Sequence, residues 1–307
     1  MAVRPLELLD LPLIYRHRDE VAGLDSTRLL TRGNPLGAVG LMAYINPARH
    51  VHAALADGNG RAVLGGIIQT RGEQFAKLLF LAPVRNLDNP ELPALLDALA
   101  EEAGSWGAFH VSAEVEETGD AFLPLRRAGY AVYAWQRMWD VSEIAVEQRR
   151  SGWKRVRSAD AGAVQSLYQQ IVPPLLHAIE PVPPQNEVGW ISNEGSRCYA
   201  GMRHGLYGIV LSPLIHPEAS EVSVRLASLI GNLPDRRGRP VYVCVRSYEA
   251  WLEPVLADLG AKAASRQAVM VKHLAHPLKD EQLVKLAQPA RASVQPSRVT
   301  HIQKNGS

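Results

Sequence analysis

The chain has 307 residues, of which 47% are hydrophobic and 21% charged, and its 33 basic and 31 acidic residues give a formal charge of +2. This composition is typical of a globular protein, and the length favours two domains because single cores rarely grow to this size. A nearly neutral chain has no general attraction to nucleic acid, and no apolar run approaches the ~20 residues that cross a bilayer, so neither kind of partner is expected.

The cysteines and the N-terminus narrow the class of protein further. Cys198 and Cys244 are 46 positions apart (244 − 198) and belong to no CxxC pair, so neither a metal site nor a disulfide framework is predicted. Residues 1–20 place acids and arginines among their apolar positions and contain no small-residue cleavage site, which argues against a signal peptide. We therefore expect a cytoplasmic protein without a metal.

A strand, a helix and a three-stranded meander are expected first. Residues 3–9 can form an edge strand, and Asp10 can cap the helix that follows. Residues 50–56 and 62–70 flank a turn with two glycines, which accept a positive φ, and this pattern predicts an antiparallel hairpin. Residues 75–81 add the third strand.

A helix and a strand-helix-strand unit complete the first half. Pro90 stands at the start of a helix with one apolar stripe of leucines, and Gly104 is expected to end it. Residues 108–141 then contain a buried strand, a helix that stops at Gly129, and a second strand.

The second half repeats this order of elements. Asp160 precedes an amphipathic helix, residues 198–202 and 207–215 are strands of a shorter meander, and a helix ends at Gly231. Residues 239–274 then match the unit at 108–141. Four landmarks recur at a spacing of 130 or 131 residues: Pro83 with Pro213, Pro124 with Pro254, Gly129 with Gly260, and Gln136 with Gln267. The sequence therefore predicts a duplication.

A charged stretch at residues 142–152 is suited to a linker between the copies. We predict an N-terminal domain at residues 1–148, a C-terminal domain at residues 149–275, and a disordered tail at residues 276–307. The fold class is α/β (α+β), and each domain is expected to be a mixed, mostly antiparallel twisted sheet flanked by helices.

The order of elements in both halves resembles that of the GNAT superfamily, the acetyl-CoA-dependent N-acyltransferases. A signature of that family before its final strand resembles Asn-x-x-Ala-x-x-x-Tyr-x-x-x-Gly-Phe. Within residues 118–130, Ala121, Gly129 and Tyr130 fall on its alanine, glycine and aromatic positions. The resemblance covers about residues 3–275 and implies two tandem GNAT-like domains.

The resemblance also implies a site for acetyl-CoA. The family binds the pyrophosphate with an R-x-x-G-x-G/A loop after its fourth strand, because glycines let backbone N–H groups approach phosphates at a helix N-terminus. The loop of the first half keeps an arginine but contains Asp88 and Pro90 and no glycine, and residues 214–218 of the second half depart further. The N-terminal domain is therefore the candidate cofactor binder, with six candidate residues: Leu81, Pro83, Val84, Arg85, Asn86 and Thr118.

The catalytic groups that the family implies are replaced. The tyrosine that acts as general acid, four residues before the glycine, is Leu125 in the first half and Leu256 in the second. Tyr133, on the final strand of the first half, is a candidate proton donor, and the alternative is that it only packs in the sheet.

A general base for the acceptor amine has two candidate sources. Glu114, Glu116 and Glu117 lie at the end of the fifth strand, and alternation places Glu114 and Glu116 on one face. His50 and His52 share one face of the second strand. The alternatives are a solvated strand end and an exposed hairpin. Our candidate catalytic set is Glu114, Glu116 and Tyr133.

Two functions remain open from the sequence. The first is a GNAT-type N-acyltransferase that moves an acetyl group from acetyl-CoA to an amine of a small molecule or peptide. The second, as the alternative, is a catalytically inactive tandem GNAT-like protein that senses a ligand or binds another protein, which the missing glycines and tyrosines favour. We place the enzyme first, because a variant loop that keeps Arg85 could still hold a phosphate. Either a monomer with an intramolecular pseudo-dimer or a homodimer is expected.

Overall fold

A computed structural model describes residues 3–41, 49–58, 60–144, 152–184, 188–192 and 197–274. The chain divides into two units, Met1–Leu274 and Ala275–Ser307, and the first of these is described below. The predicted domain boundary near residue 148 and the predicted tail at residues 276–307 lie outside the described residues. No helix in the described part is both long and apolar enough to span a membrane.

The first half opens with short elements: β1 (Arg4–Pro5), η1 (Leu8–Asp10), α1 (Leu11–His17), β2 (Ala22–Gly23), α2 (Ser26–Arg32) and α3 (Ala38–Leu41). The sequence predicted β1 and α1 but missed η1, β2, α2 and α3. The role predicted for Asp10 was wrong. Its carboxylate accepts the N–H of Glu7 at 2.9 Å and pairs with Arg4, so it stabilises the turn before α1 and makes no side-chain cap on the helix.

The rest of the first half follows the prediction: β3 (Arg49–Gly58), β4 (Arg61–Thr70), β5 (Phe75–Ala82), η3 (Val84–Asn86), α4 (Leu92–Ser105), β6 (His110–Glu116), α5 (Phe122–Arg127) and β7 (Ala131–Asp140). Gly129 follows α5 with φ +87°, a conformation that glycine adopts without strain. Gly104 lies inside α4 instead of ending it, and Gly107, with φ +86°, comes after its last turn.

The second half contains β8 (Trp153–Arg155), η4 (Ser158–Asp160), α6 (Ala161–Ile171), η5 (Pro174–Leu176), β9 (Val188–Ser192), β10 (Cys198–His204), β11 (Ile209–Ile215), α7 (Val222–Gly231), β12 (Val241–Arg246), η6 (Ser247–Glu249), α8 (Leu252–Asp258) and β13 (Lys262–His273). The sequence missed β9, which pairs antiparallel with β10 and makes this meander three-stranded like the first.

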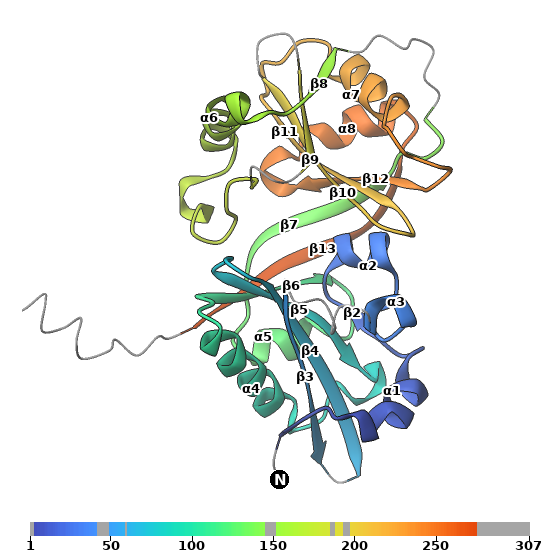
Figure 1. The fold of residues 1–307 in the computed structure, drawn as a ribbon, viewed down its shortest axis with the longest axis vertical. Helices are drawn as coiled ribbons and strands as arrows, with labels where there is room; N and C mark the ends of the chain where they lie inside the picture. Colours follow the sequence, from blue (N-terminus) through green and yellow to red (C-terminus); the bar gives the residue numbers. More distant parts are fainter. Residues whose placement is uncertain are drawn as a thin grey trace, which may run out of the picture. The chain divides into compact units, whose positions relative to one another are not determined.

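The two halves exchange their last strands (Figure 1). Among the described residues, thirteen strands form one sheet, in which β13 lies between β6 and β7 while β7 pairs with β12. The β5–β6 and β11–β12 pairs are parallel and the other pairs are antiparallel. Ala268 and Met270 of β13 therefore belong to the first core, and Trp139 of β7 belongs to the second. Neither half has a complete sheet of its own.

The centre of the exchange lies between two landmarks of the duplication. The β7–β13 register pairs Gln136 with Gln267, and Nε2 of Gln136 donates to Oε1 of Gln267 at 2.8 Å. Because the same position of each copy meets at this point, the copies are related by an approximate twofold axis through this pair.

Helices cover both faces of each half of the sheet. α4 and α5 pack on one face of the first half and α1 packs on the other. α7 and α8 cover one face of the second half, and α6 covers the other. α2 belongs to the first half, but its Leu30 packs against Met138, Val210 and Cys244 in the sheet of the second. It therefore connects the two halves.

Candidate functional site

The strands β5 and β6 separate soon after they begin to pair. Their parallel pairing runs only from Phe75 and His110 to Lys77 and Ser112. Beyond that point the strands leave a space, which we call the β5–β6 groove. It lies where the resemblance places the end of the fourth strand and the start of the cofactor loop.

The chain's own residues 20–26 lie in this groove. Ala22 and Gly23 pair antiparallel with Leu81 and Phe80 of β5. Leu24 completes the bridge, because its N–H donates to the carbonyl of Leu79 at 2.9 Å and its carbonyl accepts the N–H of Glu114 in β6 at 2.8 Å. An extended segment thus links the two strands where they no longer pair.

The predicted pyrophosphate loop contacts the same segment. The N–H of Val84 donates to the carbonyl of Glu20 at 2.9 Å, and the guanidinium of Arg85 pairs with the Glu20 carboxylate. This ion pair is about half exposed, so it contributes little to stability. The carbonyl and the carboxylate of Glu20 therefore bond to the N–H of Val84 and the guanidinium of Arg85, the two groups that a cofactor phosphate would contact.

The start of α4 provides no further phosphate cradle. Asn89 is buried, its Oδ1 accepts the N–H of Glu91 at 2.9 Å and its carbonyl accepts that of Leu92 at 3.0 Å, so these two N–H groups are already bonded by the chain itself. Asp88 pairs with Arg61 at 2.5 Å, and Asp88 and Glu91 both place negative charge near this terminus. Among the predicted cofactor residues, only Arg85 carries a positive charge.

The other predicted cofactor residues have varied surroundings. Leu81 pairs with Ala22 in the groove, and the side-chain amide of Asn86 donates to the carbonyl of Ala62 at 2.7 Å. Pro83 joins β5 to η3. Thr118 is exposed in the turn after β6.

Two of the predicted catalytic residues meet in a partly buried polar cluster, which we define as Glu114, Tyr133, Glu180, Arg246 and Tyr248. Glu114 faces the start of α2, where its Oε2 accepts the N–H of Ser26 at 2.8 Å. Its Oε1 lies 4.0 Å from Arg246, and Arg246 lies 3.3 Å from Glu180. Glu114 therefore connects the groove to the other members of the cluster.

Two partly buried phenols, those of Tyr133 and Tyr248, lie beside the carboxylate of Glu180. Burial raises the pKa of Tyr133 well above its usual value; Arg246 opposes this shift, while Glu180 and Glu114 add to it. The hydroxyl of Tyr248 donates to Glu180, and burial together with that carboxylate raises the pKa of Tyr248 as well. Both phenols stay protonated at neutral pH and can act as hydrogen-bond donors.

The remaining base candidates lie apart from this cluster. Glu116 is exposed at the end of β6, and Glu117 pairs with Arg266 on the surface at 2.8 Å. The ring of His50 stacks on Trp106 with centroids 5.2 Å apart. The structure thus brings together Glu114 and Tyr133 but not Glu116.

The second half has a corresponding opening between β11 and β12, which pair in parallel only as far as Leu211 and Val243. Further along β11, Pro213 has no N–H to donate, and the N–H of Ile215 donates to Oε1 of Glu249 at 2.9 Å. Burial raises the pKa of Glu249 to about 8; the N–H of Ile215 opposes this shift and Glu180 adds to it. This opening is therefore closed by a buried carboxyl group that titrates near neutral pH.

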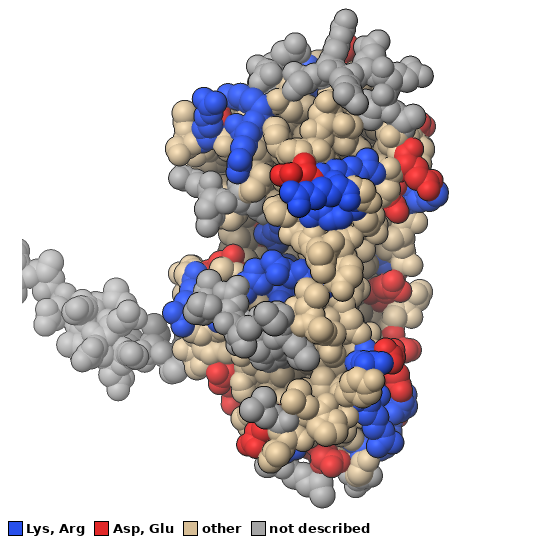
Figure 2. Space-filling model, turned by 45° about the vertical axis from the view of Figure 1, so that its right-hand side comes forward, with Lys and Arg blue, Asp and Glu red and all other residues tan. Residues whose placement is uncertain are grey.

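A cavity of about 370 Å³ lies between the halves. We call it the cationic cavity, because Lys and Arg side chains gather around the recess between the halves in Figure 2. Its charged lining consists of Asp25, Arg28, Arg32, Arg49, Glu73, Lys77 and Arg203. No sequence pattern predicted this site, because the charges come from α2, β3, β5, β10 and the β4–β5 turn.

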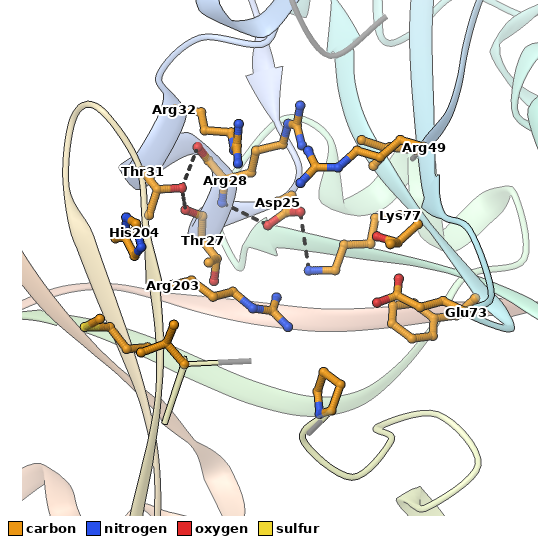
Figure 3. Close-up of a pocket in the computed structure, with 16 residues that line it drawn as sticks. Asp25, Thr27, Arg28, Thr31, Arg32, Arg49, Glu73, Lys77, Arg203 and His204 are labelled. Atoms are coloured by element: carbon orange, nitrogen blue, oxygen red, sulfur yellow. Dashed lines mark hydrogen bonds and ion pairs between the residues drawn. The ribbon is translucent and has the colours of Figure 1, made fainter. Parts of the chain in front are cut away.

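An ion pair between Asp25, just before α2, and Lys77 of β5 lines the cavity (Figure 3). The carboxylate of Asp25 accepts the N–H of Arg28 at 3.1 Å and lies 3.3 Å from Nζ of Lys77. Burial alone would raise the pKa of Asp25. The charge of Lys77, the hydrogen bond from the N–H of Arg28 and the charges of Arg203 and Arg28 outweigh burial and lower the pKa. Among the described residues, no group of three His, Cys, Asp or Glu side chains has the geometry of a metal site.

Comparison with known proteins rests on the fold, since no family model and no curated protein matches the sequence. A GCN5-related N-acetyltransferase from Sphaerobacter thermophilus is similar with a TM-score of 0.52 at 13% identity, over 89% of this chain and 95% of that one. A tandem GNAT protein from the clavulanic acid biosynthesis pathway, solved without AcCoA, is similar with a TM-score of 0.50 at 14% identity, over 91% and 99%. The chain has a tandem GNAT fold. The predicted fold class and duplication are confirmed.

Proposed function

We propose that this tandem GNAT protein is an acyltransferase that moves an acyl group from a CoA thioester, acetyl-CoA in the simplest case, to an amine of a small molecule or peptide. The β5–β6 groove carries the proposal. It already holds an extended segment that bonds to β5 through backbone amides and ends in a carboxylate on Arg85. The pantetheine arm of CoA is also a linear chain with amide groups and a phosphate at its end.

Entry of the donor requires residues 20–24 to leave the groove. The carbonyl of Leu79 and the N–H of Val84, which now bond to Leu24 and Glu20, would then be open to the donor. Arg85, released from Glu20, would be the cation for the donor phosphate. The first half is the donor site in this proposal, because the second opening is closed by Glu249.

Glu114 and Tyr133 supply the acid–base groups. Withdrawal of residues 20–24 would remove the hydrogen bond between the carbonyl of Leu24 and the N–H of Glu114, while Oε2 of Glu114 would keep the N–H of Ser26 at the start of α2. The amine nitrogen attacks the thioester carbonyl, the new C–N bond forms, and the C–S bond breaks. Glu114 would accept the proton from the amine, and the protonated Tyr133 would give a proton to the thiolate.

Calorimetric titration of acetyl-CoA into wild type, Arg85→Ala and Glu20→Gln tests this proposal. Glu20→Gln removes the carboxylate that competes for Arg85, and we expect binding to tighten by up to about five-fold, because an exposed ion pair contributes ~1 kcal/mol or less. Arg85→Ala should weaken binding, whereas the exposed Arg126→Ala on α5 should not change it. Absence of heat at millimolar acetyl-CoA in both wild type and Glu20→Gln would overturn the proposal.

A further inference from the structure

The approximate twofold axis allows β6 and β12 to be compared position by position. The axis glutamine of β13 pairs with Glu116 on β6, and the axis glutamine of β7 pairs with Arg246 on β12. Two residues earlier in the same strands, Glu114 corresponds to Cys244. Both pairs are 130 positions apart (246 − 116 and 244 − 114), as other landmarks of the duplication are. The two copies therefore differ in charge at two matching positions.

These differences leave the two halves unequal near the axis. Glu116 is exposed at the end of β6, whereas Cys244 is buried and its thiol is uncharged at neutral pH, because burial raises its pKa to about 12. The second half thus has no carboxylate at the position of Glu114, and the first half has no cation at the position of Arg246. The arginine that lies beside Glu114 comes from the other copy.

Contacts from both copies hold the guanidinium of Arg246. Its Nη1 donates to Oε1 of Gln136 at 2.6 Å, and Gln136 is fixed in turn by its hydrogen bond to Gln267. Its Nε lies 3.3 Å from Oε1 of Glu180, in the segment before β9. The side chain of Arg246 is 21% exposed, so water weakens these contacts less than it would on the surface. The charge of Arg246 therefore has a fixed place in the cluster.

Glu114 lies close enough to Arg246 to be affected by its charge but not bonded to it. Nη2 of Arg246 lies 4.0 Å from Oε1 of Glu114, which is too long for a hydrogen bond, while the N–H of Ser26 bonds to the other oxygen, Oε2. Arg246 thus leaves Oε1 able to accept a proton. Its charge offsets the repulsion between the carboxylates of Glu114 and Glu180, which would otherwise favour a proton on one of them.

The same guanidinium acts on the proposed proton donor. Burial raises the pKa of Tyr133, Arg246 opposes this shift, and Glu180 and Glu114 add to it. Among these three charged groups, Arg246 is the one that makes the release of a proton from Tyr133 easier. One side chain of the second half thus affects both acid–base groups of the first.

We propose that Arg246 is a positioning residue for acyl transfer in the first half, an inference that rests on the proposed function. Arg246 keeps the carboxylate of Glu114 in place and ionised until the amine gives it a proton. It also favours the transfer of the phenolic proton of Tyr133 to the departing thiolate. The second half therefore contributes to catalysis although its own opening is closed by Glu249.

Release of CoA thiol from acetyl-CoA, followed with a thiol reagent and a mixture of small primary amines, tests the inference in the full chain. We expect Arg246→Gln to lower kcat roughly 10- to 100-fold, as for loss of one interaction with a charged group. The affinity for acetyl-CoA, measured by calorimetry, should stay as in wild type. Arg246→Lys keeps the charge but cannot reach three partners with a planar fork, so its kcat should lie between those of wild type and Arg246→Gln.

Arg137→Gln is the matched control. Arg137 lies on β7, is 29% exposed and pairs with Glu253 of α8, so its loss also removes a partly buried ion pair of the central sheet. Both glutamine variants should lose stability in urea unfolding, but only Arg246→Gln should lose kcat. This comparison separates an effect on acyl transfer from an effect on folding.

The outcomes distinguish this inference from the proposed function. Unchanged kcat in Arg246→Gln, or an equal loss in Arg137→Gln, would overturn the inference and leave the proposed function standing. A loss of acetyl-CoA affinity as large as the loss of rate would also overturn it, because Arg246 would then serve donor binding. If Arg246→Gln does not fold, wild-type kcat in Arg246→Lys overturns the inference. Thiol release by wild type no faster than without protein would overturn both.

Discussion

The buried carboxyl of Glu249 should make the stability of this protein depend on pH, and replacing it with glutamine should remove that dependence. Glu249 is 2% exposed and its Oε1 accepts the N–H of Ile215, a hydrogen bond that the amide oxygen of glutamine can also accept. Burial raises its pKa from 4.5 to about 8. Glu249→Gln therefore keeps the local structure but not the ionisation.

The sign and size of the effect follow from linkage. Between pH 4.5 and pH 8 the folded protein holds a proton at Glu249 that the unfolded chain has lost, so the contribution to stability is complete below pH 4.5 and is lost as the pH rises through 8. The difference of about 3.5 between the two pKa values (8 − 4.5) corresponds to about 5 kcal/mol, at ~1.4 kcal/mol per pKa unit.

Urea unfolding followed by circular dichroism at several pH values between 4.5 and 8.5 measures this effect. We expect the free energy of unfolding of wild type to fall by several kcal/mol relative to that of Glu249→Gln across the range, whereas Glu116→Gln, at an exposed site, should stay parallel to wild type. Parallel pH profiles for wild type and Glu249→Gln would refute the reasoning.

Three further predictions concern packing and reactivity. Gly205→Ala should cost about 1–3 kcal/mol in thermal unfolding, because its Cβ would lie 2.1 Å from the carbonyl oxygen of Thr31 in α2; a neutral effect would show that the two halves pack less closely there. Gly162→Ala, in α6 with open space around it, should instead stabilise by ~0.5–1 kcal/mol, and a loss would contradict the helix. Burial raises the pKa of Cys244 to about 12 and also raises that of Cys198, so iodoacetamide at pH 8 should label both only after denaturation; rapid labelling of the native protein would contradict their burial.

Local signals account for the part of the fold that the sequence predicted. The unit at residues 108–141 combines two apolar strands with a helix that ends before Gly129, and these features depend on neighbours in the chain. The partners of its last strand could not be predicted, because an exchanged and an unexchanged strand bury the same residues. Trp139 thus packs in the second core although it belongs to the first copy.

The site was predicted in part for the same reason. Alternation along β6 predicted Glu114 as a candidate base, and the loop after β5 predicted Arg85 as a candidate cofactor residue. The contacts of residues 20–26 with Glu114 and Arg85 could not be predicted, because β2 has two residues and α2 has seven, too few for a clear periodic pattern. The cationic cavity was missed because its arginines are far apart in the chain and meet only through α2 and the packing of the two halves.

Hydrogen exchange at the backbone amides of residues 20–26 and 84, with and without acetyl-CoA, tests the proposed donor site most directly. The N–H of Leu24 bonds to Leu79 and that of Val84 bonds to Glu20 in the structure, so both should exchange slowly without the donor. If the donor replaces this segment in the β5–β6 groove, exchange at Leu24 should accelerate when acetyl-CoA binds. Binding that leaves the protection of Leu24 unchanged, or no binding at millimolar donor, would contradict the proposal.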